Sequence, residues 1–188
     1  MTQKSKDNQE ALNHNEQGDA LYNLEKYDEA IACYDEAIRL DPENVEALNG
    51  KGDSLHNLEK YEEAIACYDE AIRLDPENVE TWNSKGFFFH NLEKYEEEAI
   101  ACYDEAIRLD PENMEAWDFK CDILQEQKKY EEVIACYDER IRLNPKEDFF
   151  WSEKGNLLDE LGRNEEATLC HNECDRLVNQ SMQGRLIT

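Results

Sequence analysis

One segment of this chain recurs at a nearly constant interval, and that interval constrains the fold more than any other feature. The stretch NLEKYEEAIACYDEAIRLDPEN covers Asn57 to Asn78, and it recurs almost letter for letter at Asn23 to Asn44. A copy with one additional Glu runs from Asn91 to Asn113, and a looser copy runs from Glu126 to Pro145. Four prolines keep the same interval of 34 or 35 residues: Pro42, Pro76, Pro111 and Pro145. Such a period is typical of stacked helical units that bury a core only against their neighbours.

The period divides the chain into five units. They are residues 11–44, 45–78, 79–113, 114–147 and 148–181, and we expect them to form a single domain. Residues 1–10 are polar and without periodicity, so they predict a flexible lead-in, and residues 182–188 a short tail.

Each unit is expected to contain two helices. In the third unit, Trp82, Gly86 and Phe89 have the i, i+4, i+7 spacing of one helical face. In the second unit, Ala64, Ile65, Tyr68, Ala71 and Ile72 form a comparable face. The intervening LEKY predicts a turn, and the proline after Leu-Asp ends the second helix because it cannot donate a backbone hydrogen bond.

The balance of charge is strongly acidic. The 188 residues include 20 Lys and Arg against 46 Asp and Glu, a formal net charge of -26. Such a field repels nucleic acids and anionic membranes and favours a basic partner. The alternative is that the acidity only maintains solubility.

Cysteine usage and the absence of apolar runs bear on the compartment. Five of the seven cysteines keep the repeat interval, and packed helices would hold them on the order of 10 Å apart, too far for disulfides. Free thiols indicate a reducing compartment. The N-terminal residues contain no apolar run of a signal peptide, and no segment approaches about 20 consecutive apolar residues. We therefore expect a cytoplasmic protein.

The residues at fixed places in each unit resemble the tetratricopeptide repeat family. The pattern of aromatic, small and proline positions is clearest in the third unit: Trp82, Gly86, Tyr95, Ala99, Tyr103, Ala106 and Pro111. The resemblance covers Ala11 to about Ser181. It implies an all-α, right-handed superhelical solenoid of antiparallel helix pairs, with the first helix of each pair lining a concave groove.

Several positions depart from the repeated pattern. One Glu is inserted among Glu96–Glu98, and we expect a bulge or a longer turn that keeps Tyr95 and Ala99 packed. The fourth unit has Cys121, Val133 and Arg140 where small residues are expected, and this bulk should loosen its packing against the fifth unit. The family's usual C-terminal solvating helix is missing or vestigial, which leaves self-association possible.

The resemblance also implies which side chains face the groove. Carboxamides there can bracket the backbone of an extended peptide, because each offers a donor and an acceptor; the candidates are Asn49, Asn57, Asn83 and Asn91. His90 lies at a neighbouring groove position, and Asp53 and Asp122 would attract Lys or Arg. The alternative is that these Asn and Asp side chains are solvated or cap nearby turns.

Aromatic residues offer a second contact. Phe87, Phe119 and Phe149 fall at positions that converge on one ligand in family members, and buried aromatic anchors concentrate binding energy. Phe87 and Phe119 are therefore candidates to anchor an apolar side chain of a partner. The alternative is that one or more of these rings pack between the fourth and fifth units.

No pattern in the sequence supports catalysis or a cofactor. The four histidines have no nucleophile or carboxylate at a known catalytic spacing, and there is no Gly-rich phosphate loop or Cys-x-x-Cys pair. The family's clamp for acidic chaperone C-termini needs cationic residues, whereas the matching positions here are Asn15, Asp19, Gly50, Glu80 and Ser84.

Two functions remain after these exclusions. The sequence predicts a non-catalytic interaction scaffold that binds a basic peptide or helix of a partner protein. The alternative is a structural module that self-associates through its C-terminal unit, giving a homodimer.

Overall fold

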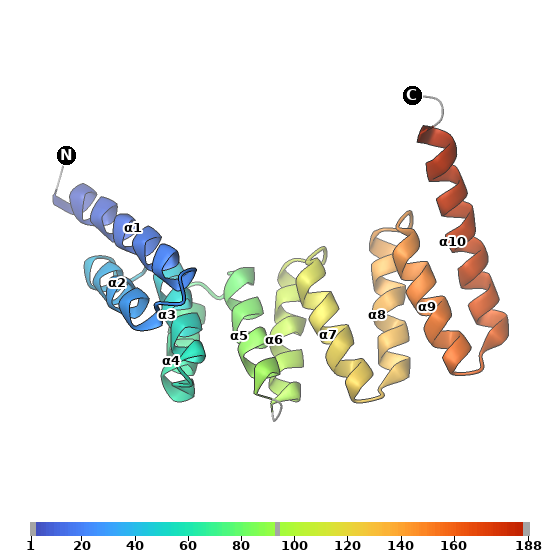
Figure 1. The fold of residues 1–188 in the computed structure, drawn as a ribbon, viewed down its shortest axis with the longest axis horizontal. Coiled ribbons are helices and arrows are strands. Elements are labelled where there is room, and N and C mark those ends of the chain that lie inside the picture. Colours follow the sequence, from blue (N-terminus) through green and yellow to red (C-terminus); the bar gives the residue numbers. More distant parts are fainter. Residues whose placement is uncertain (1–2, 93–94, 186–188) are drawn as a thin grey trace. The chain divides into compact units, whose positions relative to one another are not determined.

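The computed structural model describes residues 3–92 and 95–185, and side chains from 6 to 92 and from 95 to 182. The described residues form ten helices and no strand (Figure 1). The helices are α1 (Gln3–Tyr22), α2 (Tyr27–Leu40), α3 (Val45–Asn57), α4 (Tyr61–Leu74), α5 (Val79–Asn91), α6 (Glu96–Leu109), α7 (Met114–Glu126), α8 (Tyr130–Leu143), α9 (Asp148–Glu160) and α10 (Asn164–Arg185). The predicted all-α solenoid of helix pairs is confirmed.

The helices form two compact units. Unit 1 is Met1–Asp110 and contains α1 to α6, and unit 2 is Pro111–Thr188 and contains α7 to α10. In unit 1 the closest approaches are within the pairs α1–α2, α3–α4 and α5–α6, and α9–α10 is the corresponding pair of unit 2. The first helices of unit 1 also contact one another, α1 with α3 and α3 with α5. That the whole chain is a single domain stays a prediction.

Asparagine side chains begin three of the first helices. The Oδ1 atoms of Asn44, Asn78 and Asn113 accept a hydrogen bond from the backbone N–H three residues later, at 2.8 to 2.9 Å. This contact satisfies one of the donors that a helix N-terminus leaves without an intrahelical partner. The recurring Pro-Glu-Asn of the sequence therefore ends one helix and caps the next.

The turn inside a helix pair requires a left-handed residue. Glu25, Glu59 and Lys128 have φ values of 57° to 59°, and Gly162 occupies the corresponding place after α9 with a φ of 74°. A residue of this conformation directly after a helix allows the chain to reverse, and glycine adopts it at the lowest cost. Among these four turns, the three without glycine therefore carry a modest backbone strain.

Glycines allow the two helices of a pair to approach each other. A Cβ on Gly52 would lie 2.8 Å from Cε1 of Tyr68, which is fully buried, and Gly86 has the same relation to Tyr103. A real Cβ does not approach a ring carbon this closely, so the glycine is needed for packing. The recurrence of glycine inside predicted helices is explained by this contact.

The inserted glutamate is accommodated before α6. Helices α2, α4 and α8 begin at a tyrosine, whereas α6 begins at Glu96, and Tyr95 is its N-cap. Ala99 is fully buried as predicted. Tyr95, however, is 41% exposed, and its ring centroid lies 5.7 Å from that of Phe89. The prediction that Tyr95 stays packed is wrong, because the additional residue pushes it out of the helix.

The two helices of the fourth repeat, α7 and α8, pack against each other less closely than those of the other repeats. Cys121, Val133 and Arg140 are all buried, and α7 and α8 approach each other much less closely than the two helices of the other pairs. Bulky side chains at positions that are elsewhere Gly or Ala keep the backbones apart. The expected loosening was placed at the junction with the fifth repeat, but α8 and α9 remain in contact and the separation lies between α7 and α8.

The first and last helices extend beyond the predicted boundaries of the repeats. α1 begins at Gln3, inside the segment predicted as a flexible lead-in, and α10 continues to Arg185, past the predicted boundary at 181. α10 has 22 residues, compared with 14 in α2, α4, α6 and α8. The last helix is therefore longer than a repeat requires.

Candidate functional site

The first helices of unit 1 border a pocket of about 320 Å³, which we call the acidic pocket. Its walls come from α1, α3 and the first turn of α5, with one ring from α2. The lining residues are Asn15, Asp19, Tyr22, Asn23, Tyr34, Glu46, Asn49, Gly50, Asp53 and Glu80. Four of these side chains are carboxylates, and none is Lys or Arg.

Two Tyr–Asp hydrogen bonds orient two of the pocket carboxylates, Asp19 and Asp53. The Tyr34 hydroxyl donates to Oδ1 of Asp19 at 2.8 Å, and the Tyr68 hydroxyl donates to Oδ1 of Asp53 at 2.6 Å. Both rings are buried between the two helices of a pair. Because a buried ring cannot turn freely, each aspartate has a defined orientation.

Gly50 opens the pocket next to Tyr34. A Cβ at this position would lie 2.5 Å from Cζ and 2.7 Å from the hydroxyl oxygen of Tyr34. The corresponding positions in the next two repeats are Ser84 and Phe119, so this opening is particular to the second repeat. Gly50 therefore allows α3 to approach the Tyr34 ring of α2 without a side chain that would fill this part of the acidic pocket.

Two asparagines in the pocket wall contain oxygens without a hydrogen-bond donor. Asn49 is 6% exposed; its Nδ2 donates to Oγ1 of Thr81 at 2.8 Å, and this bond ties α3 to α5. The Oδ1 atoms of Asn49 and Asn15 are buried and have no donor among the described residues. A buried oxygen left in this state costs free energy that an incoming donor can recover.

Burial changes the acidity of Asp53. Removal from water raises the pKa of its carboxyl to about 6, and the negative charge of Glu80 adds to the rise, against the opposing hydrogen bond from Tyr68. Asp19, Glu46 and Glu80 are exposed at the edge of the pocket. A cation that enters the pocket would meet one half-buried carboxylate and three exposed ones, and it would favour the charged form of Asp53.

Comparisons with known proteins assign the family. Two models of the tetratricopeptide repeat match residues 15–79 and 67–99, and the ten helices correspond to about five such repeats. The chain belongs to the tetratricopeptide repeat family. A model of the protein prenyltransferase alpha subunit repeat matches residues 96–127, and this match identifies no catalytic residue in the chain. A search of curated proteins gives no match to this chain.

Solved structures of tetratricopeptide repeat proteins have the same fold. MamA from Desulfovibrio magneticus RS-1 has a TM-score of 0.65 and 18% identity, covering 91% of this chain and 96% of that one. YrrB, described as having an unusual peptide-binding site, has a TM-score of 0.62 and 21% identity, covering 94% and 91%. The first repeat domain of Spaghetti (RPAP3), bound to an HSP90 peptide, has a TM-score of 0.59 and 28% identity, covering 64% and 95%.

The structure brings only some of the predicted groove residues into the acidic pocket. Asn49 and Asp53 line it, and Asn57 lies next to it, where its Nδ2 donates to the Tyr22 hydroxyl at 3.3 Å and to the Asp53 carbonyl at 2.8 Å. Asn91 likewise donates to the carbonyl of Phe87 in its own helix, at 3.0 Å. Both donors thus have acceptors within the chain, and that Asn57 and Asn91 hold a partner's backbone stays a prediction.

The other predicted residues of unit 1 lie on α5. Phe87 is 44% exposed, and its ring centroid lies 6.4 Å from that of His56 on α3. Asn83 and His90 are half-buried on the same helix. Phe88, which the sequence did not single out, is the fully buried ring of this region, 5.2 Å from His56. Phe87 therefore provides an apolar surface in unit 1 outside the acidic pocket.

Two predicted residues belong to unit 2. Phe119 is half-buried and Asp122 is exposed, both on α7. Because they lie in a different compact unit, their convergence with Phe87 stays a prediction. The sequence missed Tyr34, Glu46, Gly50 and Thr81 as parts of the site. The first glycine in LNGKGD, which is Gly50, was the available signal for the opening.

The described residues contain neither a membrane-spanning helix nor a cluster of side chains suited to a metal ion. No helix among residues 3–92 and 95–185 is long and apolar enough to cross a bilayer. In the same part of the chain, no group of three His, Cys, Asp or Glu side chains is placed to hold a metal ion. All seven cysteines are free thiols, and most are buried.

Proposed function

We propose that unit 1 is a peptide-binding scaffold that takes a basic segment of a partner protein into the acidic pocket. The fold itself is one on which protein-interaction scaffolds are built, but fold alone does not establish a function. The observation that carries the proposal is the combination, in one pocket, of four carboxylates with two buried carboxamide oxygens that have no donor.

A Lys or Arg side chain of the partner is the group that fits this pocket. An ammonium or guanidinium only donates hydrogen bonds, and every charged group in the wall only accepts them. The cation would lie between Asp19, Asp53 and Glu80, with small shifts of the carboxamides bringing Oδ1 of Asn15 or Asn49 to its N–H groups. Phe87 would hold an apolar residue of the same segment, and Asn83, His90 and Asn91 would flank it. Phe119 and Asp122, on unit 2, are proposed as further contacts of the partner protein.

The same chemistry argues against other partners. The RPAP3 domain is described with a bound HSP90 peptide, but the pocket here contains no Lys or Arg to pair with an acidic chain terminus. A net charge of -26 likewise disfavours nucleic acid and anionic membranes. We propose a non-catalytic role without cofactor, in the cytoplasm, where seven free thiols would remain reduced.

A charge-matched pair of variants tests the proposal. Fluorescence anisotropy would measure the affinity of a labelled Lys-rich peptide for three proteins. They are the wild type, the double variant Glu46→Gln/Glu80→Gln and the double variant Glu62→Gln/Glu63→Gln. Both variants remove two negative charges, but only the first pair lines the pocket, whereas Glu62 and Glu63 are exposed on α4. We expect about tenfold weaker binding for the pocket variant and a smaller change for the control. Equal losses in the two would reject a pocket-specific site in favour of general charge attraction.

Self-association is the second candidate, supported by exposed apolar side chains on α10. Leu169 is 70% exposed and Met182 is also exposed, on a helix longer than a repeat requires. Light scattering would measure the solution mass at low and high salt, with Leu169→Glu beside the wild type. A dimer that resists salt and dissociates in the variant would support this role, whereas a monomer at all salt concentrations would exclude it.

A further inference from the structure

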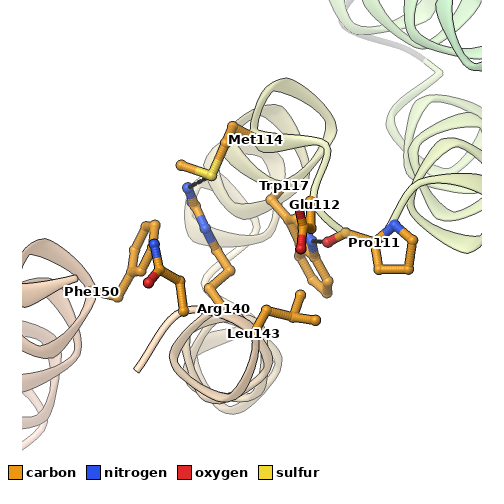
Figure 2. A pocket seen from close by; sticks show the side chains of 8 residues that line it. Pro111, Glu112, Met114, Trp117, Arg140, Leu143 and Phe150 are labelled. Atoms are coloured by element: carbon orange, nitrogen blue, oxygen red, sulfur yellow. Dashed lines mark hydrogen bonds between the residues drawn. The ribbon is translucent and has the colours of Figure 1, made fainter. Parts of the chain in front are cut away.

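Unit 2 contains a pocket of about 380 Å³ that the proposed peptide site does not use. It lies where α7, α8 and α9 meet, and we call it the Arg140 pocket after the side chain at its centre. Figure 2 shows Arg140 rising from α8 between Phe150 and Trp117, with Leu143 at its base and Met114 above the guanidinium. The walls therefore combine apolar and aromatic side chains with Glu112 and Asn144, around one cation.

The pocket exists because the fourth repeat breaks the pattern of the others. The residues at the position of Arg140 in the first three repeats are Ala37, Ala71 and Ala106, and all three are fully buried. Arg140 is buried as well, at 4% exposed. A guanidinium occupies far more volume than a methyl group, and α7 and α8 lie correspondingly far apart. The opening is thus a property of this repeat and not of the repeat pattern.

The hydrogen-bonding capacity of Arg140 is incompletely used. Its Nη1 donates to Oδ1 of Asp118 at 2.5 Å, its Nη2 contacts Sδ of Met114 at 3.5 Å, and its guanidinium carbon lies 3.9 Å from the ring centroid of Phe150. A thioether is a weak acceptor. Nε is buried and has no acceptor among the described residues. A buried donor in this state is destabilising until an acceptor reaches it.

From these contacts we infer that the Arg140 pocket binds a neutral aromatic residue of a partner, with its ring against Trp117 and Leu143 and its backbone carbonyl accepting from the Arg140 guanidinium. The volume is within the range of pockets that hold small organic groups. Arginine and aromatic side chains are the residue types that concentrate binding energy at interfaces.

Access and charge define this occupant further. Met114 is 52% exposed at the edge of the pocket, and its flexible side chain can move so that the carbonyl reaches the covered guanidinium. An anionic group is disfavoured, because Glu112 also lines the pocket and Asp118 already neutralises the guanidinium. A neutral carbonyl supplies the missing acceptor without adding a negative charge.

The test uses the whole chain and the probe N-acetyl-L-phenylalaninamide, which combines a neutral ring with amide carbonyls. The indole N–H of Trp117 donates to the carbonyl of Pro111 at 3.0 Å, so its resonance in a ¹H–¹⁵N spectrum reports on the pocket wall. We expect a saturable shift of that resonance with a Kd of about 1 mM, as for a ligand of this size. The indole resonance of Trp82, in unit 1, is the internal control and should not shift.

Two comparisons make the result decisive. Arg140→Ala restores the residue that the first three repeats have at this position, and Arg140→Lys keeps the charge but removes Nε. Each variant should bind the probe at least tenfold more weakly than the wild type. Circular dichroism would confirm that both variants keep the helical fold. On the wild type alone, N-acetyl-L-phenylalanine, which has a free carboxylate, should bind more weakly than the amide. No saturable shift, undiminished affinity in Arg140→Ala, or tighter binding of the carboxylate would each overturn the inference.

Discussion

Replacing Asp53 with asparagine should stabilise the protein near neutral pH. The pKa of this carboxyl is about 6 in the folded chain, against an ordinary value of 3.8, and the first cause is burial. A raised carboxyl pKa means that the folded state resists ionisation, so stability is lost as the pH rises from the unfolded pKa to the folded one. Each pKa unit corresponds to about 1.36 kcal/mol, so ionised Asp53 costs about 3 kcal/mol at pH 7.

Asparagine removes that cost and preserves the local contact. Its Oδ1 can still accept the hydrogen bond that the Tyr68 hydroxyl now donates at 2.6 Å. We therefore expect Asp53→Asn to raise the free energy of unfolding by about 3 kcal/mol above pH 7 and by about half of that near pH 5.

Urea unfolding followed by circular dichroism, from about pH 5 to pH 8, measures this difference. Asp19→Asn is the matched control, because Asp19 accepts the same bond from Tyr34 but is exposed, and its substitution should change stability by less than about 0.5 kcal/mol. A gain that does not grow with pH, or an Asp53→Asn variant less stable than the wild type at pH 7, would refute the burial argument.

Three further predictions follow from the packing. Glu59→Gly should raise the free energy of unfolding by about 1 kcal/mol in urea titrations, because it relieves the φ of 59° after α3; a loss would contradict the strain. Gly52→Ala should lower it by about 1–3 kcal/mol, since the new Cβ would lie 2.8 Å from the Tyr68 ring; an unchanged midpoint would show that the ring yields. Maleimide labelling followed by mass spectrometry should modify Cys33 and Cys174 before the five buried thiols, and the reverse order would contradict the burial of those five.

The fold could be predicted from sequence because its determinants are local and repeated. The interval of the prolines located the helix pairs, and the recurrent glycine indicated the close approach now seen between Gly52 and Tyr68. The insertion was also anticipated as a change in the turn before Ala99. Its effect on Tyr95 was not, since a helix can begin at either of two adjacent residues and only tertiary packing decides between them.

The site was harder to predict because its residues interact across repeats. Asn49 looked like a free carboxamide in sequence, but its Nδ2 bonds Thr81 in the next repeat. Arg140 looked like a packing defect, and it instead forms a pocket with residues of three helices. Neither contact follows from a period or a spacing, because each depends on which side chain of a neighbouring helix lies within reach.

The measurement that tests the central claim most directly is a ¹H–¹⁵N titration of the protein with a Lys-rich peptide. We expect shifts concentrated in α1, α3 and the start of α5, including the side-chain amides of Asn15 and Asn49, and their loss in Glu46→Gln/Glu80→Gln. Shifts confined to unit 2, or no saturable shift at low salt, would contradict the proposal that the acidic pocket receives a basic segment.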